Sequence, residues 1–222
     1  MRYTISDIHG CRKTFRQALK TINFSKDDEL FLLGDFIDRG PDSMGVLDTV
    51  WELTAAGHRV TCLRGNHEQM LIDYADGRRK QFDWIPPPDR FEETIDWMRG
   101  LPFYHQTPGY FLVHAGLNFG VPNPLDDTYS MLWIRDWYGE VDKSWLGDRV
   151  IVHGHTPAPM ESIKQSIYFM DSTKRVCIDS GCAWARRDLS HLTVLNLDTR
   201  EGIFLENKDK PKPKGLFSWS VK

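Results

Sequence analysis

An apolar segment followed by a polar loop occupies residues 29–41, which read Glu29-Leu30-Phe31-Leu32-Leu33-Gly34-Asp35-Phe36-Ile37-Asp38-Arg39-Gly40-Pro41. The unbroken apolar run predicts a strand that is buried on both faces, as in a parallel sheet. Gly34 lets the chain turn sharply after this strand. The polar side chains that follow would then lie at its carboxyl end, which is where open α/β sheets bind their ligands.

The same pattern on both sides of this stretch predicts a mainly parallel sheet in the first hundred residues. Further strands are predicted over Arg2–Ser6 and Val60–Leu63, and helices over Thr14–Ile22, from after Pro41 to about Gly57, and from Glu68 to at least Tyr74. Strand–helix–strand repeats of about 30 residues are typical of βαβ units.

Strands dominate the second half, and their short connections favour antiparallel pairing. They are predicted over Phe103–Gln106, Tyr110–His114, Val150–His153, Ile167–Met170, Arg175–Asp179, Leu192–Leu197 and Gly202–Glu206. We therefore expect an α/β fold, a sandwich of two mixed β-sheets flanked by helices. One catalytic domain would span residues 1–206, and the lysine- and proline-rich residues 207–222 would form a basic, flexible tail.

The composition is that of an ordinary globular protein, with 222 residues, 41% hydrophobic and 27% charged. A net charge of −3 gives no indication of a nucleic-acid partner or an anionic membrane. The longest apolar runs are too short to cross a bilayer, and the first seven residues turn polar too early for a signal peptide. Four cysteines in a chain of this size favour a reducing compartment. We expect a cytoplasmic monomer.

Five clusters of polar residues fall where predicted strands end, and each contains glycine. They are Asp7-Ile8-His9-Gly10, Gly34 to Gly40, Arg64-Gly65-Asn66-His67-Glu68, His114-Ala115-Gly116 and His153-Gly154-His155-Thr156. Carboxylate, amide and imidazole donors together suit Mn²⁺, Fe or Zn²⁺. A central carboxylate such as Asp35 can bridge two ions about 3.5–4 Å apart, a spacing suited to phosphoryl displacement. One cluster alone would more often be a turn, but five in this order predict a site.

Taken together, these motifs resemble those of the phosphoprotein phosphatase family of calcineurin-like dinuclear metallophosphoesterases. The resemblance runs from Asp7 to Thr156 and departs at Ser6, where the family usually has glycine. It implies two divalent metal ions, Mn²⁺ first, with Fe or Zn²⁺ as alternatives. One ion would be held by Asp7, His9 and Asp35, and the other by Asp35, Asn66, His114 and His155. A hydroxide bridging the ions would attack phosphorus in line.

The resemblance also implies residues that act beside the metals. His67 matches the general acid for the leaving oxygen, and Asp38 matches the carboxylate that orients it. Arg39 and Arg64 match arginines that bind phosphate oxygens, and Arg135, in Trp133-Ile134-Arg135, resembles a third. A planar guanidinium suits bidentate contact with phosphate.

Two substrate classes remain open at this point, a phosphorylated protein or a small phosphoester. A serine/threonine protein phosphatase is the leading expectation, because Glu68 follows Asn66-His67 and Thr156 follows His155. The alternatives are a symmetrical dinucleoside tetraphosphate hydrolase and a broad small-molecule phosphatase. A catalytically inactive binding module is disfavoured, since every candidate ligand and His67 are present. Trp84, Trp133 and Trp137 are candidates for the rim of the cleft, and His153 for a structural role.

Overall fold

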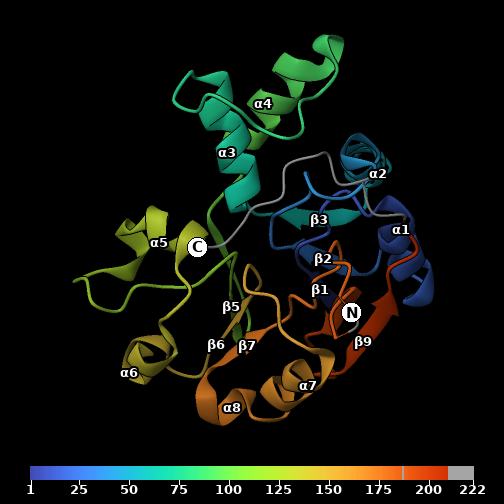
Figure 1. The fold of residues 1–222 in the computed structure, drawn as a ribbon. Helices are drawn as coiled ribbons and strands as arrows, with labels where there is room; N and C mark the ends of the chain where they lie inside the picture. Colours follow the sequence, from blue (N-terminus) through green and yellow to red (C-terminus); the bar gives the residue numbers. More distant parts are fainter. Residues whose placement is uncertain (187, 210–222) are drawn as a thin grey trace.

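The computed structural model describes residues 1–186 and 188–209. Two β-sheets pack face to face, and helices cover their outer faces (Figure 1). This arrangement confirms the predicted sandwich of two mixed sheets. In chain order the elements are β1 (Arg2–Ile5), α1 (Arg12–Thr21), β2 (Glu29–Leu32), α2 (Ser43–Ala55), β3 (Arg59–Cys62), α3 (Asn66–Ala75), α4 (Phe91–Arg99), β4 (Tyr104–Thr107), β5 (Tyr110–Val113), α5 (Thr128–Trp133), α6 (Lys143–Leu146), β6 (Val150–His153), α7 (Met160–Tyr168), α8 (Met170–Thr173), β7 (Arg175–Cys177), β8 (His191–Asn196) and β9 (Gly202–Glu206).

The first sheet has the strand order β3-β2-β1-β8-β9. Its first three strands are parallel, with Thr4 opposite Phe31 and Phe31 opposite Thr61. Strand β8 then pairs antiparallel with β1, and β9 antiparallel with β8. The last two strands that the structure describes therefore complete the sheet that the first three begin.

The second sheet has the order β4-β5-β6-β7 and differs from the expected antiparallel pairing. Only β4 and β5 pair antiparallel, whereas β5, β6 and β7 are parallel. The reason is that the connections from β5 to β6 and from β6 to β7 each contain helices, which provide the crossover that parallel strands need.

The strand predicted over Ile167–Met170 is wrong, because these residues belong to α7 and α8. Ile163 and Met170 are buried and Ile167 packs against the same core as Met170. Their spacing of four and three residues is that of one face of a helix. The short apolar run alone could not separate a strand from a helix.

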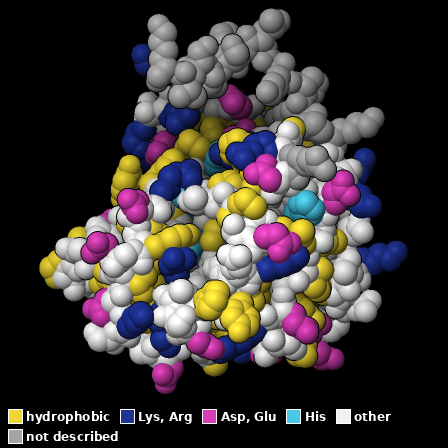
Figure 2. Space-filling model, turned by 60° about the horizontal axis from the view of Figure 1, so that its bottom comes forward, with side chains coloured by type: hydrophobic (Ala, Val, Ile, Leu, Met, Phe, Trp, Pro, Cys, Tyr) yellow, Lys and Arg dark blue, Asp and Glu magenta, His cyan; other side chains and the backbone are white. Residues whose placement is uncertain are grey.

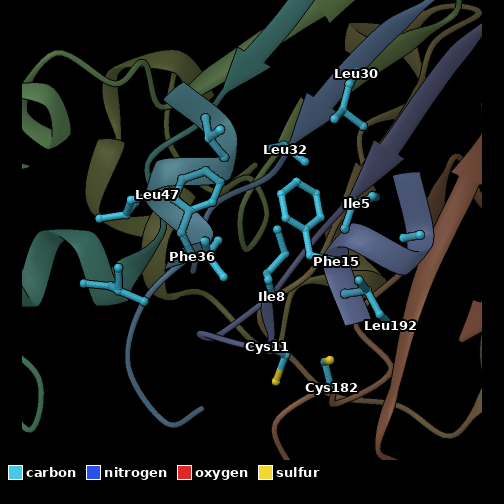
Figure 3. Packing of buried hydrophobic residues seen from close by; sticks show 14 of the residues in the cluster. Ile5, Ile8, Cys11, Phe15, Leu30, Leu32, Phe36, Leu47, Cys182 and Leu192 are labelled. Atoms are coloured by element: carbon cyan, nitrogen blue, oxygen red, sulfur yellow. The ribbon is translucent and has the colours of Figure 1, made fainter. Parts of the chain in front are cut away.

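Strand β2 and the residue after it contribute side chains to two cores, which explains the unbroken apolar run. Leu30 and Leu32 pack beneath α1 and α2 with Phe15 and Leu47 (Figure 3). Phe31 and Leu33 point the other way, into the core between the two sheets. Each fully buried side chain of this kind stabilises the fold by about 1.5–3 kcal/mol.

Packed chain continues past β9 to Asp209, three residues beyond the predicted domain end. The Asp209 carboxylate accepts hydrogen bonds from the backbone N–H groups of Lys13 and Thr14, at 3.0 Å each. These are free donors of the first turn of α1, whose N-cap residue Cys11 makes no side-chain cap. The remainder of the predicted basic tail, residues 210–222, lies outside the described residues.

Within the described ranges, no helix combines the length and apolar character needed to cross a membrane.

Candidate metal centre

All five polar clusters lie beyond the carboxyl ends of β1, β2, β3, β5 and β6, and contacts between the two sheets' loops bring them together. Their backbone is strained, since the residues with positive φ include Asp7, His9, Asp35, Asp38, Arg39 and His155. Such conformations cost about 1–3 kcal/mol each and concentrate at functional sites. Two glycines let the loops approach closely, because a Cβ on Gly34 would collide with the backbone of Gly65.

One group of donors lies around the Oδ2 oxygen of Asp35. His9 Nε2 lies 3.4 Å from Asp35 Oδ2 and 3.8 Å from Asp7 Oδ1. His67 Nε2 lies 3.9 Å from the same Asp35 oxygen, so His9, Asp35 and His67 also form a geometrically possible metal-binding group. All four side chains are buried.

A second group shares Asp35 and contains His114 and His155. His114 Nε2 lies 3.6 Å from Asp35 Oδ1 and 2.8 Å from Asn66 Oδ1. His155 Nδ1 lies 2.8 Å from the same Asn66 oxygen. The structure thus brings together all six predicted ligands, with Asp35 between the two groups.

The ring orientations suit metal binding. His9 Nδ1 is 2.9 Å from the Ile37 carbonyl and His114 Nδ1 is 2.8 Å from the Leu33 carbonyl. A carbonyl can only accept, so each Nδ1 carries a proton, and the Nε2 of each ring is the nitrogen directed at the oxygens of the centre, as in many metal sites. His155 Nε2 is buried and has no hydrogen-bond partner among the described residues.

The electrostatics of the cluster also favour a cation. Burial lowers the pKa of His9 and of His155 to about 3, which keeps both rings neutral. Burial and the nearby Asp35 raise the pKa of Asp7, although His114 acts in the opposite direction. A positive ion would restore the charged form of Asp7. The residues present therefore fit a pair of divalent ions, the cofactor implied by the sequence motifs.

Ser6, the departure from the family pattern, supports the first cluster. Its hydroxyl donates to Asp7 Oδ2, which also accepts the backbone N–H of His155 at 3.0 Å. The other Asp7 oxygen is the one that faces His9.

His67 lies between Asp38 and Arg39, and since a guanidinium can only donate, the histidine Nε2 accepts from Arg39. Its Nδ1 is 2.9 Å from Asp38 Oδ2, and its Nε2 is 3.1 Å from Arg39 Nη2. Burial lowers the pKa of His67, but Asp35 and the hydrogen bond to Asp38 outweigh it and the net shift is upward. Asp38 thus fixes the ring and directs Nε2 toward the centre.

The other two predicted arginines lie farther from this cluster. Arg64 donates to Gln69 Oε1 at 3.0 Å and to the Arg99 carbonyl, and its guanidinium stacks on Phe103 at 4.7 Å. Arg135 donates to the His155 carbonyl at 3.2 Å and to Thr156 Oγ1 at 3.3 Å. Of the three predicted phosphate arginines, Arg39 is the one whose guanidinium contacts His67.

Glu68 has a structural role that the sequence did not reveal. Its carboxylate is fully buried and accepts three backbone N–H groups, from Asp35 at 2.8 Å, Phe36 at 2.9 Å and Gly65 at 2.9 Å. Glu68 therefore joins the loop after β2 to the loop after β3. Only the fold brings these loops together.

Asp179 is a second buried carboxylate near the centre that the sequence motifs did not include. It is buried two residues beyond β7, and burial together with the charges of Asp7 and Asp35 raises its pKa well above the usual value. Its place after a strand end is the same signal that identified the other clusters.

The aromatic and histidine predictions had mixed outcomes. Trp133 lies edge-on to His155, with ring centres 6.4 Å apart. Trp137 is 2% exposed and belongs to a core cluster, so it does not form a rim. Trp84 packs against the core beneath α1 and α2. His153 is buried, 3.1 Å from the Tyr138 hydroxyl, which agrees with a structural role. In Figure 2 histidine side chains are visible in only a few places, in keeping with their burial.

Comparison with protein families gives a match to the model of the calcineurin-like phosphoesterases over residues 3–189. Among curated proteins, the chain is 33% identical over 181 residues to a symmetrical bis(5'-nucleosyl)-tetraphosphatase of Aromatoleum aromaticum. The matched stretch covers 69% of this chain and 65% of that protein. It is 38% identical over 121 residues to the protein of the same name from Nitrosomonas europaea, covering 52% of this chain and 44% of that protein. The matched stretches thus span about half to two-thirds of these relatives.

Solved structures show the same fold at low identity. A serine/threonine phosphatase from Saccharomyces cerevisiae has a TM-score of 0.71 at 15% identity, covering 96% of this chain and 82% of that chain. A candidate diadenosine tetraphosphatase has a TM-score of 0.64 at 20% identity, covering 96% and 94%. At these identities the likeness concerns the fold alone.

The names of the curated relatives overturn the leading expectation of a serine/threonine protein phosphatase and favour the dinucleoside tetraphosphate alternative. The structure explains the error. The expectation depended on Glu68 and Thr156, but Glu68 is turned toward backbone N–H groups and Thr156 toward Arg135. Neither side chain is placed to distinguish an alkyl phosphate from a polyphosphate.

Proposed function

This chain belongs to the calcineurin-like phosphoesterase family, and from that premise we propose that it hydrolyses dinucleoside tetraphosphates symmetrically, releasing two nucleoside diphosphates. The observation that carries the proposal is the 33% identity over 181 residues to a protein named for this reaction. The buried centre, rich in histidines and carboxylates, supports it. Bound cations stabilise the charge of a phosphoanhydride during its hydrolysis, and this reaction depends less on a general acid supplied by a side chain.

Six side chains would hold the metals. We assign Asp7, His9 and Asp35 to one ion, and Asp35, Asn66, His114 and His155 to the other. Asp7 is preferred to His67 for the first ion because both His67 nitrogens already have partners, Asp38 and Arg39. When bound, two divalent cations would neutralise charge on the phosphoryl group and lower the pKa of a water molecule.

The chain's own residues would orient the substrate and move a proton. Arg39 would donate to a non-bridging phosphate oxygen near His67, which its guanidinium already contacts. Once the Arg39 guanidinium donates to phosphate instead of to Nε2, His67 would protonate the leaving oxygen from Nε2, with Asp38 holding Nδ1. The leaving group is a nucleoside diphosphate, whose terminal phosphate titrates near pH 6. It therefore needs less help from an acid than an alkoxide would.

The test is product analysis. Purified protein is incubated with diadenosine tetraphosphate and Mn²⁺, and nucleotides are separated by ion-exchange chromatography. We expect ADP as the sole nucleotide product and a kcat/KM at least tenfold above that for a phosphoserine peptide. The matched control is Asp35→Asn, prepared in parallel, which should be inactive on both. Formation of ATP and AMP, or faster turnover of the peptide, would contradict the proposal.

A further inference from the structure

An exposed tryptophan contacts an arginine that lies beside the metal centre. Trp184 lies in the segment between β7 and β8 and is 40% exposed. The Arg39 guanidinium stacks on its ring, 5.3 Å from the ring centre. The same guanidinium reaches His67 Nε2 at 3.1 Å. Arg39 therefore lies between Trp184 and His67, and contacts both.

A second pair of aromatic side chains, Trp133 and Tyr129, lies beside His155 of the other donor group. Trp133 lies edge-on to His155, and Tyr129 stacks on Trp133 with ring centres 6.2 Å apart and planes 28° apart. Both come from α5, and Tyr129 is 73% exposed. Burial in a core does not account for a side chain with this exposure.

The two stacks begin at histidines of different donor groups. His67 belongs to the group with His9, and His155 to the group with His114, and Asp35 is common to both. The aromatic surfaces thus begin at different donor groups, which share Asp35. Arginines accompany both, Arg39 against Trp184 and Arg135 against the His155 carbonyl.

We propose that these two aromatic surfaces bind the two nucleobases of the substrate, one base on Trp184 and the other on the Tyr129–Trp133 stack. The inference rests on the proposed function and adds a base-binding role to it. A substrate with a base at each end of a four-phosphate chain needs two such surfaces flanking the centre if it is to be cut in the middle. Aromatic side chains bind any base through its π-face.

The experiment measures competition against p-nitrophenyl phosphate, so that it does not depend on dinucleotide turnover. Inhibition constants are determined for diadenosine tetraphosphate and for base-free tripolyphosphate, at a fixed free Mn²⁺ concentration. The variants are Trp184→Ala, Trp184→Phe and Tyr129→Ala. Tyr168→Ala is the matched control, since Tyr168 is an 81% exposed tyrosine on α7 that packs against Phe169.

We expect Trp184→Ala and Tyr129→Ala each to weaken the dinucleotide by about 5- to 100-fold, with tripolyphosphate changed by less than twofold. Trp184→Phe should retain most of the affinity because it keeps a ring beneath Arg39, and Tyr168→Ala should behave as the parent. Equal weakening of both competitors would mean that Trp184 acts only through Arg39, which would overturn the base-binding role. Unchanged dinucleotide affinity in both alanine variants would also overturn it.

These outcomes are separate from the test of the proposed function. If no ADP is released but the dinucleotide still competes in a Trp184-dependent way, the base surfaces remain and the reaction assignment fails. If ADP is released and neither aromatic matters, the reaction stands and the base surfaces fail.

Discussion

Removal of the Glu68 carboxylate should cost far more stability than removal of an exposed glutamate. In Glu68→Ala three buried N–H groups lose their acceptor, at distances of 2.8–2.9 Å. An unsatisfied buried donor costs about 1–3 kcal/mol. Because water can enter the space left by the side chain and satisfy part of the set, we expect a total loss of about 3–5 kcal/mol. For a chain of this length that corresponds to a fall in Tm of about 6–20 °C.

Glu68→Gln provides a graded comparison. Oε2 accepts from Asp35 and Gly65, whereas Oε1 accepts only from Phe36. A glutamine with its oxygen at the Oε2 position keeps two of the bonds and turns its NH₂ group toward the Phe36 N–H. The expected loss is about 1–2 kcal/mol. The surface control is Glu140→Ala, which should change stability by less than about 0.5 kcal/mol.

The assay is urea and thermal unfolding followed by circular dichroism, in EDTA so that metal binding does not contribute to the apparent stability. A separate Mn²⁺ titration should show an affinity about 10–100-fold lower in Glu68→Ala, since the Asp35 loop loses its support. The reasoning is refuted if Glu68→Ala is as stable as Glu140→Ala. A glutamine variant less stable than the alanine variant would also refute it.

Three further predictions concern the centre itself. Asp35→Asn should bind fewer metal ions than the parent protein, as measured by elemental analysis, and lose nearly all activity, because Asp35 belongs to both donor groups. Full metal content with full activity would show that Asp35 does not have this role. Arg39→Ala should raise KM and lower kcat more than Arg64→Ala in steady-state assays, because Arg64 is already bonded to Gln69; the reverse order would contradict the phosphate role of Arg39. His67→Asn should lower turnover of a phosphoserine peptide by about 10²–10⁴-fold and that of p-nitrophenyl phosphate by distinctly less, with metal content kept; equal losses would assign His67 to substrate positioning, and lost metal would make it a ligand.

The location of the site could be predicted from the sequence because it depends on local patterns. Apolar runs that end in glycine and polar residues identify the strands and their carboxyl ends, and parallel strands bring such ends to one edge. The clusters at Asp7, Asp35 and Asn66 follow this rule in the first sheet, and those at His114 and His155 follow it in the second. Packing of the two sheets then brings both sets together. The family was recognisable for the same reason, since its motifs are these loops.

Other features depend on contacts between residues far apart in the chain. The pairing of β8 with β1 and the parallel second sheet follow from crossovers whose helices were only partly visible as patterns. Glu68 looked like a marker of substrate class until its contacts with the Asp35 loop were seen. Trp184 carried no signal at all, because its relevance comes from Arg39, which is remote in sequence and adjacent in space. Residue types and periodicity therefore determined most of the strands and the donors at their carboxyl ends. Tertiary packing alone decided which side chains support the donors and which aromatic surfaces flank them, because those contacts form only when distant segments are brought together.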